Sequence, residues 1–295
     1  MKGVVLAGGL GSRLLPLTKV TNKHLLPVYD KPMIYYPIQT LVNAGITEIM
    51  LVTGGNSAGD FLKLLGNGRD FGLKHLSYTY QQGEGGIADA LRLAEHFADD
   101  GPLCVVLGDN LIQGNIAKAA EAFRMQKKGA KILLKEVKDP QRFGVPHLEG
   151  NRVLSIEEKP AHPRSSYAVT GIYFYDSRVF EITRTLKPSG RGELEITDVN
   201  VSYLKRGTLR VYRLARGFAW LDAGTSSSLH EASAYVQTIE KRAGIKIGCP
   251  EEAAFRSGFI SLAQLAEVTT KMPKCEYRDY LADVVAEAER LKGQK

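Results

Sequence analysis

Val4-Val5-Leu6-Ala7-Gly8-Gly9-Leu10-Gly11-Ser12-Arg13 is an apolar strand that leads directly into a glycine-rich turn ending in arginine. Glycines allow main-chain N–H groups to approach phosphate oxygens with no Cβ in the way. Arg13 adds a cationic fork suited to phosphate. The stretch therefore predicts a phosphate-binding turn at the end of a strand, and a tight turn without a ligand is the alternative.

The glycine spacing differs from the two common nucleotide-binding loops. Gly9 and Gly11 are followed by Leu14, so the third glycine of G-x-G-x-x-G is missing, and no Lys-Ser/Thr pair follows as in a Walker loop. Both a dinucleotide site and a P-loop are therefore disfavoured.

A second cation follows shortly after the turn. Lys23 stands just before the apolar Leu25-Leu26-Pro27. Arg13 and Lys23 could flank one triphosphate, whereas an ordinary surface lysine at a helix start is the alternative for Lys23.

Longer motifs resemble those of the sugar-1-phosphate nucleotidyltransferases, and most closely the glucose-1-phosphate thymidylyltransferases. They begin with L-A-G-G-x-G-S-R-L-x-P-L-T (6–18) and N-K-H-L-L-P-V-Y-D-K-P-M-I-Y-Y-P (22–37). They continue with V-L-G-D-N (106–110), F-G-V (143–145), I-E-E-K-P (156–160), Y-A-V-T-G-I-Y-F-Y-D (167–176), R-G-E-L-E-I-T-D-V-N (191–200) and A-W-L-D-A-G-T (219–225). The resemblance covers nearly the whole chain and is more specific than one glycine loop.

Composition limits the class of protein. A chain of 295 residues that is 44% hydrophobic can bury a large core, as one sizeable domain with an appendage or as two small domains. The net charge of +7 suits anionic substrates, but Lys and Arg are spread along the chain, so nucleic-acid binding is not expected.

Cysteine usage and hydropathy bear on location. The three cysteines, Cys104, Cys249 and Cys275, form no close pairs, which is typical of a reduced cytoplasmic protein. No apolar run is long enough for a signal-peptide core or a membrane span, so neither membrane insertion nor export is expected. The scattered histidines show no zinc-ligand spacing.

The hydrophobic pattern predicts an α/β fold. In the first half, strands at 3–7, 48–53 and 103–107 alternate with helices near 32–44 and 86–97. Pro32 suits a first helical position and Gly45 a C-terminal cap. Strand-like runs at 132–137, 153–157 and 169–175 then predict a doubly wound mixed sheet, Rossmann-like in its nucleotide-binding half.

Helical patterns dominate the end of the chain, from Ser226 to Ile239 and from Tyr277 to Leu291. The expected organisation is a nucleotidyltransferase domain over residues 1–240, with nucleotide-binding and sugar-phosphate-binding halves, and a helical C-terminal extension over 241–295.

Two aspartates follow predicted strands. Asp109 lies in G-D-N after the run 103–107, and Asp222 lies between Leu221 and Ala223. Ligands of open α/β sheets bind beyond the carboxyl ends of strands, and Mg²⁺ favours one or two carboxylates with phosphates and waters. A turn-forming Asp is the alternative for either residue. The resemblance implies that both hold Mg²⁺ and that they form the catalytic set together with Arg13 and Lys23.

The resemblance also implies which residues bind the substrates. Gln81, followed by Gly85-Gly86, matches the base-reading element, since a Gln amide offers both a donor and an acceptor to a pyrimidine edge. The expected nucleotide-binding residues are Leu6, Gly8, Gly9, Gly11, Ser12, Arg13, Gln81 and Gly86. The expected sugar-phosphate-binding residues are Gly144, Glu158, Lys159 and Val169. Pro160 should hold Lys159 in an extended conformation.

The function implied is Mg²⁺-dependent transfer of dTMP from dTTP to α-D-glucose 1-phosphate, which yields dTDP-glucose and pyrophosphate. The same reaction with UTP or another hexose 1-phosphate is the nearest alternative. A non-catalytic nucleotide-sugar-binding regulatory protein is the next, and a nicotinamide-dependent oxidoreductase is the third. Among the departures from the family pattern, Asp89 stands where relatives usually carry Gln, and His24 stands where many carry Gln.

The stretch Cys249-Pro250-Glu251-Glu252-Ala253-Ala254-Phe255-Arg256 resembles an element of long-form family members. There it helps form a second nucleotide site between subunits of a homotetramer, where the end product of a deoxysugar (rhamnose) pathway inhibits. The candidate residues of such a site are Gly114, Arg216 and Arg256. A packing extension without a ligand is the alternative.

Overall fold

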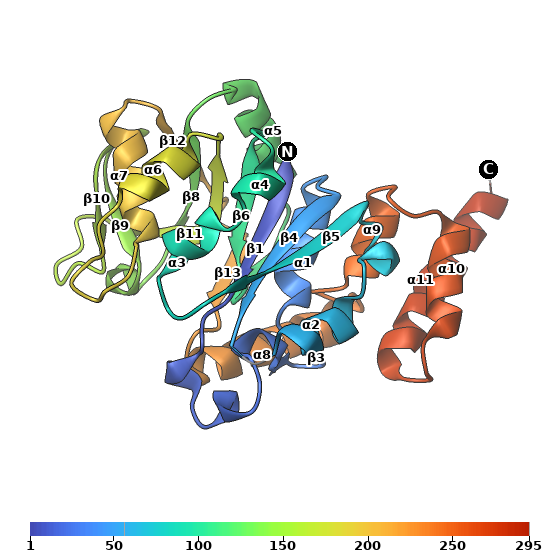
Figure 1. Cartoon of the computed structure of the whole chain (residues 1–295). Coiled ribbons are helices and arrows are strands. Elements are labelled where there is room, and N and C mark those ends of the chain that lie inside the picture. Colours follow the sequence, from blue (N-terminus) through green and yellow to red (C-terminus); the bar gives the residue numbers. More distant parts are fainter. Residues whose placement is uncertain (56, 295) are drawn as a thin grey trace.

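The computed structural model describes residues 1–55 and 57–294, which are built around a seven-stranded sheet (Figure 1). The strand order is β12 (Leu209–Arg213), β8 (Ala130–Glu136), β11 (Tyr167–Tyr175), β6 (Leu103–Leu107), β1 (Lys2–Ala7), β4 (Glu48–Gly54) and β5 (His75–Gln81).

The sheet is mixed, as predicted. Strands β4 and β6 both pair parallel with β1, β5 pairs parallel with β4, and β12 pairs parallel with β8. Strand β11 is antiparallel to both of its neighbours, β6 and β8. After β1 the chain moves outward through β4 and β5 and then returns to β6 on the other side of β1. The order of strands therefore reverses between β1 and β6, where open sheets bind ligands.

Helices cover both faces because apolar side chains alternate along the strands. Val5 and Ala7 of β1 share one core with α1 (Tyr35–Asn43), α2 (Ala58–Leu65) and α5 (Ala117–Gln126). Val4 and Leu6 share another core with α3 (Ile87–Arg92), α4 (Glu95–Ala98), α6 (Val179–Thr185) and α7 (Ile196–Lys205). Alternate residues of a strand face opposite sides, so both sides of this sheet are buried.

Three short two-stranded sheets complete the strands: β2 (Pro27–Val28) with β3 (Lys31–Pro32), β7 (Asn110–Gln113) with β13 (Ala219–Asp222), and β9 (Gly144–Glu149) with β10 (Arg152–Glu158). Single 3₁₀ turns lie at Ser12–Leu14, Leu17–Lys19, Lys23–Leu25, Arg69–Phe71 and Pro140–Arg142. The β7–β13 pair places Asp222 opposite Asn110.

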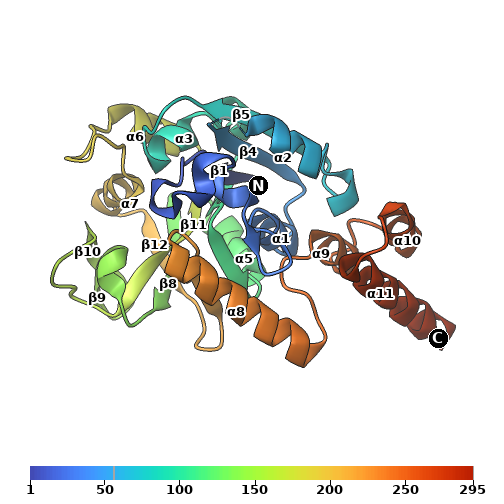
Figure 2. The same ribbon diagram turned by 90° about the horizontal axis from the view of Figure 1, so that it is seen from below.

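The C-terminal helices are α8 (Ser226–Ala243), α9 (Pro250–Arg256), α10 (Leu262–Lys271) and α11 (Glu276–Gly293). Helix α9 packs on α1, and its Ala253 and Ala254 belong to the core on that face of the sheet. Helices α10 and α11 project sideways from the sheet as an arm (Figures 1 and 2). The extension is thus joined to the body through α9.

Most of the predicted strands and helices are confirmed, with two corrections. Pro32 does not begin a helix: it pairs with Pro27 in the β2–β3 hairpin, and α1 begins at Tyr35. The helix predicted near 86–97 is divided into α3 and α4. Strands β5 and β12 of the large sheet and helices α2, α5, α6 and α7 were not predicted.

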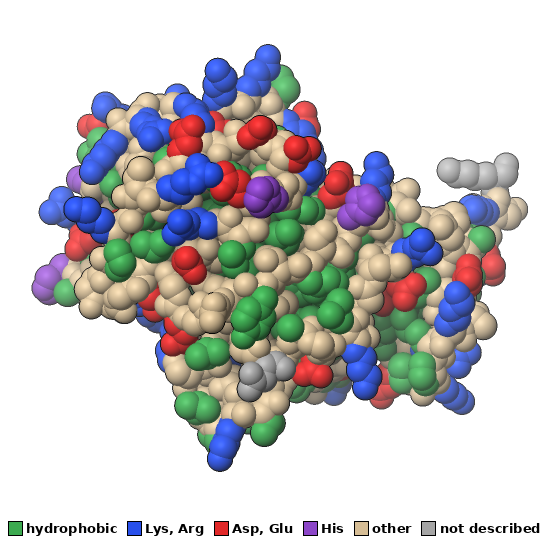
Figure 3. Space-filling model, in the orientation of Figure 1, with side chains coloured by type: hydrophobic (Ala, Val, Ile, Leu, Met, Phe, Trp, Pro, Cys, Tyr) green, Lys and Arg blue, Asp and Glu red, His purple; other side chains and the backbone are tan. Residues whose placement is uncertain are grey.

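Charged side chains of both signs are interspersed over the lobe that carries α6 and α7, on the face shown in Figure 3. Of the helices in the described part of the chain, none combines the length and the apolar character needed to cross a bilayer.

The contact between α9 and α11 contains a buried carboxyl group, which gives a testable pH dependence. Glu251 is 2% exposed, and its Oε2 accepts a hydrogen bond of 2.5 Å from the Tyr277 hydroxyl. Burial raises the pKa of Glu251 to about 7 from its ordinary 4.5. The group therefore stabilises the fold fully below its unfolded pKa, and this contribution is lost as the pH rises to about 7.

We expect the free energy of unfolding of the wild type to fall between pH 5 and pH 8 by up to about 3 kcal/mol more than that of Glu251→Gln, which cannot ionise. Urea unfolding at both pH values measures this difference. Equal pH dependence in the two proteins would contradict it.

Candidate active site

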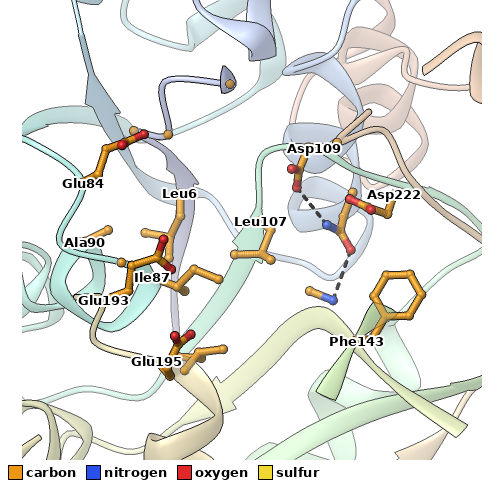
Figure 4. Close-up of a pocket in the computed structure, with 18 of the residues that line it drawn as sticks. Leu6, Glu84, Ile87, Ala90, Leu107, Asp109, Phe143, Glu193, Glu195 and Asp222 are labelled. Carbon is orange, nitrogen blue, oxygen red and sulfur yellow. Dashed lines mark hydrogen bonds between the residues drawn. The ribbon is translucent and has the colours of Figure 1, made fainter. Parts of the chain in front are cut away.

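A cavity of about 460 Å³ opens at the carboxyl ends of β1, β5 and β6. In Figure 4, Asp109 and Asp222 lie near each other on one side of it, while Glu84, Ile87 and Ala90 lie on the opposite side. The sequence-predicted catalytic, nucleotide-binding and sugar-phosphate-binding residues all line this one cavity. Their roles are therefore compatible with a single reaction site.

The glycine turn is held against the segment that carries Lys23. Gly11 has a φ of +69°, a conformation that glycine adopts without strain. A Cβ at Gly11 would lie 3.0 Å from the Lys23 Cβ, so the close packing of these two segments also requires glycine. The turn continues into a 3₁₀ turn, Ser12–Leu14, rather than an α-helix. Arg13 and Lys23 line the same cavity as the glycines.

Lys23 and Asp109 form a largely buried ion pair, with 2.5 Å between Lys23 Nζ and Asp109 Oδ2. Burial works to raise the pKa of Asp109, but the charge of Lys23 and the hydrogen bonds from Lys23 and Asn110 outweigh it and hold this pKa well below its usual range. Asp109 is therefore a carboxylate at any physiological pH.

Asp222 has less cationic compensation. Burial, with the neighbouring charge of Asp109, raises the pKa of Asp222 to about 6, although Lys23, Arg13 and Arg142 oppose the shift. Its ion pair with Arg142 is a loose one, with 3.4 Å between Arg142 Nη2 and Asp222 Oδ2. Two adjacent carboxylates, one buried and one partly buried with little cationic compensation, fit a divalent cation.

The number of carboxylates at the site also fits Mg²⁺ in particular. In the described residues, no group of three or more His, Cys, Asp and Glu side chains is arranged to hold a metal. Mg²⁺ commonly takes only one or two carboxylates and completes its shell with phosphates and waters. Asp109 and Asp222, beside the glycine turn that is predicted to bind phosphate, match that preference.

Asn110 fixes the position of both aspartates. Its Nδ2 donates to Asp109 Oδ1 at 3.0 Å, and its Oδ1 accepts from the Gly171 N–H at 3.1 Å and from Trp220 Nε1 at 2.5 Å. The main-chain N–H of Ala223 also donates to the Asp109 carbonyl. The ends of β6 and β13 are therefore locked together, which explains how residues more than a hundred positions apart meet.

His24, a departure from the family pattern, lies beneath this cluster and is 1% exposed. Burial and the charge of Lys23 lower the pKa of His24 to about 3, so it is neutral at physiological pH. Its Nδ1 lies 2.7 Å from Asn22 Oδ1, an acceptor, so this nitrogen carries the proton.

Gln81 and Gly86 line the side of the cavity away from the aspartates. The expectation that the Gln81 amide offers both a donor and an acceptor to a base is wrong for this structure. Gln81 Nε2 already donates to the Gly86 carbonyl at 3.1 Å and to Asp89 Oδ2 at 3.0 Å. Only Oε1 is left as a partner for a ligand.

The expected sugar-phosphate residues come together from three strands. Gly144 of β9 pairs with Glu158 of β10, and Val169 of β11 lies beside them. Glu158 Oε2 accepts a hydrogen bond of 2.5 Å from the Thr197 hydroxyl, which fixes this carboxylate at the cavity wall.

Lys159 is not extended, contrary to expectation. Its φ is +46°, in the left-handed region, where a residue with a side chain is strained. Its N–H donates to the Phe143 carbonyl at 3.0 Å, so the chain turns sharply at the end of the β9–β10 pair. The turn leaves Lys159 lining the cavity.

Two arginines and two aromatic residues that line the cavity were missed: Arg142, Arg191, Phe143 and Trp220. Arg142 pairs with Asp139 and reaches Asp222, and Arg191 pairs with Glu195 at 2.8 Å. The Phe143 and Trp220 rings pack at 4.8 Å between centroids. The sequence could have indicated both arginines, because Arg142 directly precedes the F-G-V motif and Arg191 is the first residue of R-G-E-L-E-I-T-D.

The residues predicted for a second nucleotide site lie away from the active-site cavity. Gly114, Arg216 and Arg256 are all described by the structure, and none of them lines that cavity. Gly114 packs against the ring of Phe218. Phe218 lies two residues after Arg216, whose side chain is exposed. Arg256 lies on α9 and pairs with Glu252 at 3.0 Å and with Glu287 at 3.4 Å. A second nucleotide site stays a prediction.

Comparison with known proteins gives a consistent result. The nucleotidyl transferase family model matches residues 2–239. A glucose-1-phosphate thymidylyltransferase of Neisseria meningitidis serogroup A is 48% identical over 283 residues, which cover 95% of this chain and 98% of that protein. One from Mycolicibacterium smegmatis is 47% identical, covering 97% and 99% of the two chains.

Solved structures show the same likeness. A Bacillus anthracis protein, crystallised with sucrose and assigned as a glucose-1-phosphate thymidylyltransferase, is 49% identical with a TM-score of 0.78, covering 85% of this chain and 99% of that one. A UDP-glucose pyrophosphorylase in complex with UDP-glucose is 26% identical with a TM-score of 0.71, covering 80% and 98%.

Proposed function

The chain belongs to the glucose-1-phosphate thymidylyltransferases of the nucleotidyl transferase family, and on that premise we propose that its cavity joins dTTP and glucose 1-phosphate into dTDP-glucose and pyrophosphate. One observation carries the proposal above all. A glycine turn, the Asp109 and Asp222 carboxylates and a carboxylate–lysine pair suited to a sugar phosphate line the same cavity of about 460 Å³. Both substrates are anionic, and three cationic side chains line the cavity: Arg13, Lys23 and Lys159.

The reaction needs no nucleophile from the protein. An oxygen of the sugar phosphate attacks the α-phosphorus of dTTP, the new O–P bond forms, and the bond to the pyrophosphate oxygen breaks in line with it. Catalysis of such a transfer is mainly positioning and stabilisation of charge. Arg13 and the glycine N–H groups hold the triphosphate, Lys23 stabilises the charge that develops near the α-phosphorus, and Glu158 with Lys159 orients the sugar phosphate.

Asp109 and Asp222 would hold Mg²⁺, which when bound neutralises phosphate charge at the reacting centre. The protein's own contribution there is the pair of carboxylates, fixed through Asn110 and the β7–β13 pairing.

The cavity-lining residues all lie between Leu6 and Gly224. This supports assigning the reaction to residues 1–240 and a different role to the extension over 241–295. From the resemblance of residues 249–256 we also infer a homotetramer in a deoxysugar (rhamnose) pathway, with a regulatory site built from that extension. From the unpaired cysteines we infer a cytoplasmic location.

Product analysis tests the function directly. The purified protein should form dTDP-glucose and pyrophosphate from dTTP and glucose 1-phosphate with Mg²⁺ and none with EDTA. A panel of NTPs and hexose 1-phosphates ranks the alternatives, and a higher kcat/KM with UTP would transfer the assignment to a uridylyltransferase. Binding of nucleotide sugar without turnover would identify a regulatory protein.

Lys159→Gln should raise the KM for glucose 1-phosphate far more than the KM for dTTP, because one charge-assisted contact to a single substrate is lost. Gln keeps a long side chain at this strained position. Lys138→Gln removes an exposed lysine outside the cavity and is the matched control. Equal increases in both KM values would contradict a specific role in binding the sugar phosphate.

A further inference from the structure

The orientation of the Gln81 amide is dictated by its two partners. Gln81 ends β5, is 6% exposed, and uses Nε2 to contact the Gly86 carbonyl and Asp89 Oδ2. A carbonyl and a carboxylate only accept hydrogen bonds, so the amide nitrogen must face them and the amide oxygen must face away. Both N–H groups of Gln81 are therefore occupied within the protein.

The free Oε1 points to the glycine turn. A Cβ at Gly8 would lie 2.6 Å from Gln81 Oε1, so glycine at this position leaves room for the oxygen. Gly85 has the same relation to Asp89: a Cβ there would lie 2.4 Å from Asp89 Oδ2. The other Asp89 oxygen, Oδ1, lies 4.0 Å from Arg92, which leaves Oδ2 to Gln81.

A nucleotide base that binds at this wall of the cavity therefore meets a hydrogen-bond acceptor, Gln81 Oε1. Thymine and uracil carry an N–H at ring position 3 and can donate it to Gln81 Oε1. Cytosine has a lone pair at that position and would have to shift along its edge to bring its amino group to the oxygen. If cytosine did not shift, its ring nitrogen and Gln81 Oε1 would face each other as two acceptors. The buried amide oxygen would then have no donor, which costs binding free energy.

We propose that Asp89 is a positioning residue that fixes Gln81 as an acceptor and thereby selects imide bases over cytosine. The inference rests on the proposed function, because it places the base of the nucleotide at Gln81. It does not separate thymine from uracil, which share this edge.

The test compares dUTP with dCTP, which differ only at this edge of the base, and uses dTTP as the reference substrate. Asp89→Ala should lower the ratio of kcat/KM for dUTP to that for dCTP by about five- to tenfold, the loss expected for one orienting hydrogen bond. Asp89→Asn should retain most of the ratio, since its amide oxygen can accept the same N–H. The KM for glucose 1-phosphate should not change.

A purely structural or electrostatic role would behave differently. Asn and Ala both remove the charge from the first turn of α3, so such a role predicts similar losses in the two variants and equal losses for dUTP and dCTP. Glu84→Ala, which removes another carboxylate of the cavity wall, is the control and should keep the wild-type ratio. An unchanged ratio in Asp89→Ala overturns the inference, as does an Asp89→Asn variant that matches Asp89→Ala. Wild-type protein that forms no nucleotide sugar from dTTP overturns the proposed function instead.

Discussion

Asp222→Asn should lower turnover by about two orders of magnitude or more, with dTTP, glucose 1-phosphate and Mg²⁺ all saturating. Asp222 lies beside Asp109, and burial together with that neighbour raises its pKa to about 6, so a bound cation is its natural partner. Removing one of the two proposed carboxylate ligands should forfeit part of the charge stabilisation that a bound metal supplies, which is worth several kcal/mol. Asp109→Asn should have a comparable effect.

The fold should survive the Asp222 substitution. Asn has nearly the same shape, and the neutral side chain relieves the repulsion from Asp109, so the unfolding midpoint without Mg²⁺ should stay the same or rise. Asp100→Asn, an exposed aspartate at a positive φ that Asn tolerates, controls for the change of charge. Rate assays over a range of Mg²⁺ concentrations separate lost affinity from lost turnover. Near-normal rates at ordinary Mg²⁺ would remove Asp222 from the metal site.

The main parts of this site could be predicted because each one is local in sequence. The apolar runs at 3–7 and 103–107 end in Gly8-Gly9 and in Gly108-Asp109, and strands that are buried on both faces read as continuous apolar segments. Ligand sites of such sheets lie beyond the strand ends, so the residues that follow the runs are the candidates that the sequence predicts. The structure brings them together between β1 and β6.

Features that depend on pairs distant in sequence could not be predicted. The bond from Arg142 to Asp222 joins residues eighty positions apart. Asp89 is a departure from the family pattern, but the sequence does not show that its carboxylate accepts a hydrogen bond from Gln81 at the end of β5. Lys159 was expected to be extended because it precedes a proline. The hydrogen bond of its N–H to Phe143, on the neighbouring strand, accompanies a left-handed turn instead. Tertiary contacts override local preference at such positions, and strain of this kind gathers at functional sites.

Replacement of Lys23 by Met is the second change with a large expected effect, because Lys23 has two successive tasks. In the structure its Nζ lies 2.5 Å from Asp109 Oδ2, and both side chains are largely buried. Loss of one member of a buried ion pair leaves the other charge uncompensated, which typically costs about 3–5 kcal/mol. Lys23→Met should therefore lower the free energy of unfolding substantially in metal-free buffer and raise the pKa of Asp109.

Mg²⁺ distinguishes this explanation from simple misfolding. A cation at Asp109 replaces the missing ammonium group, so Mg²⁺ should stabilise Lys23→Met more than the wild type, where Lys23 competes for the same carboxylate. Turnover should still fall by about a hundredfold, since the lysine is also lost as a partner of the phosphates. Lys19→Met removes an exposed lysine from the neighbouring turn and should change neither property. Equal stabilisation of wild type and Lys23→Met by Mg²⁺ would show that the metal does not reach Asp109, and the catalytic role of that carboxylate would have to be reassigned.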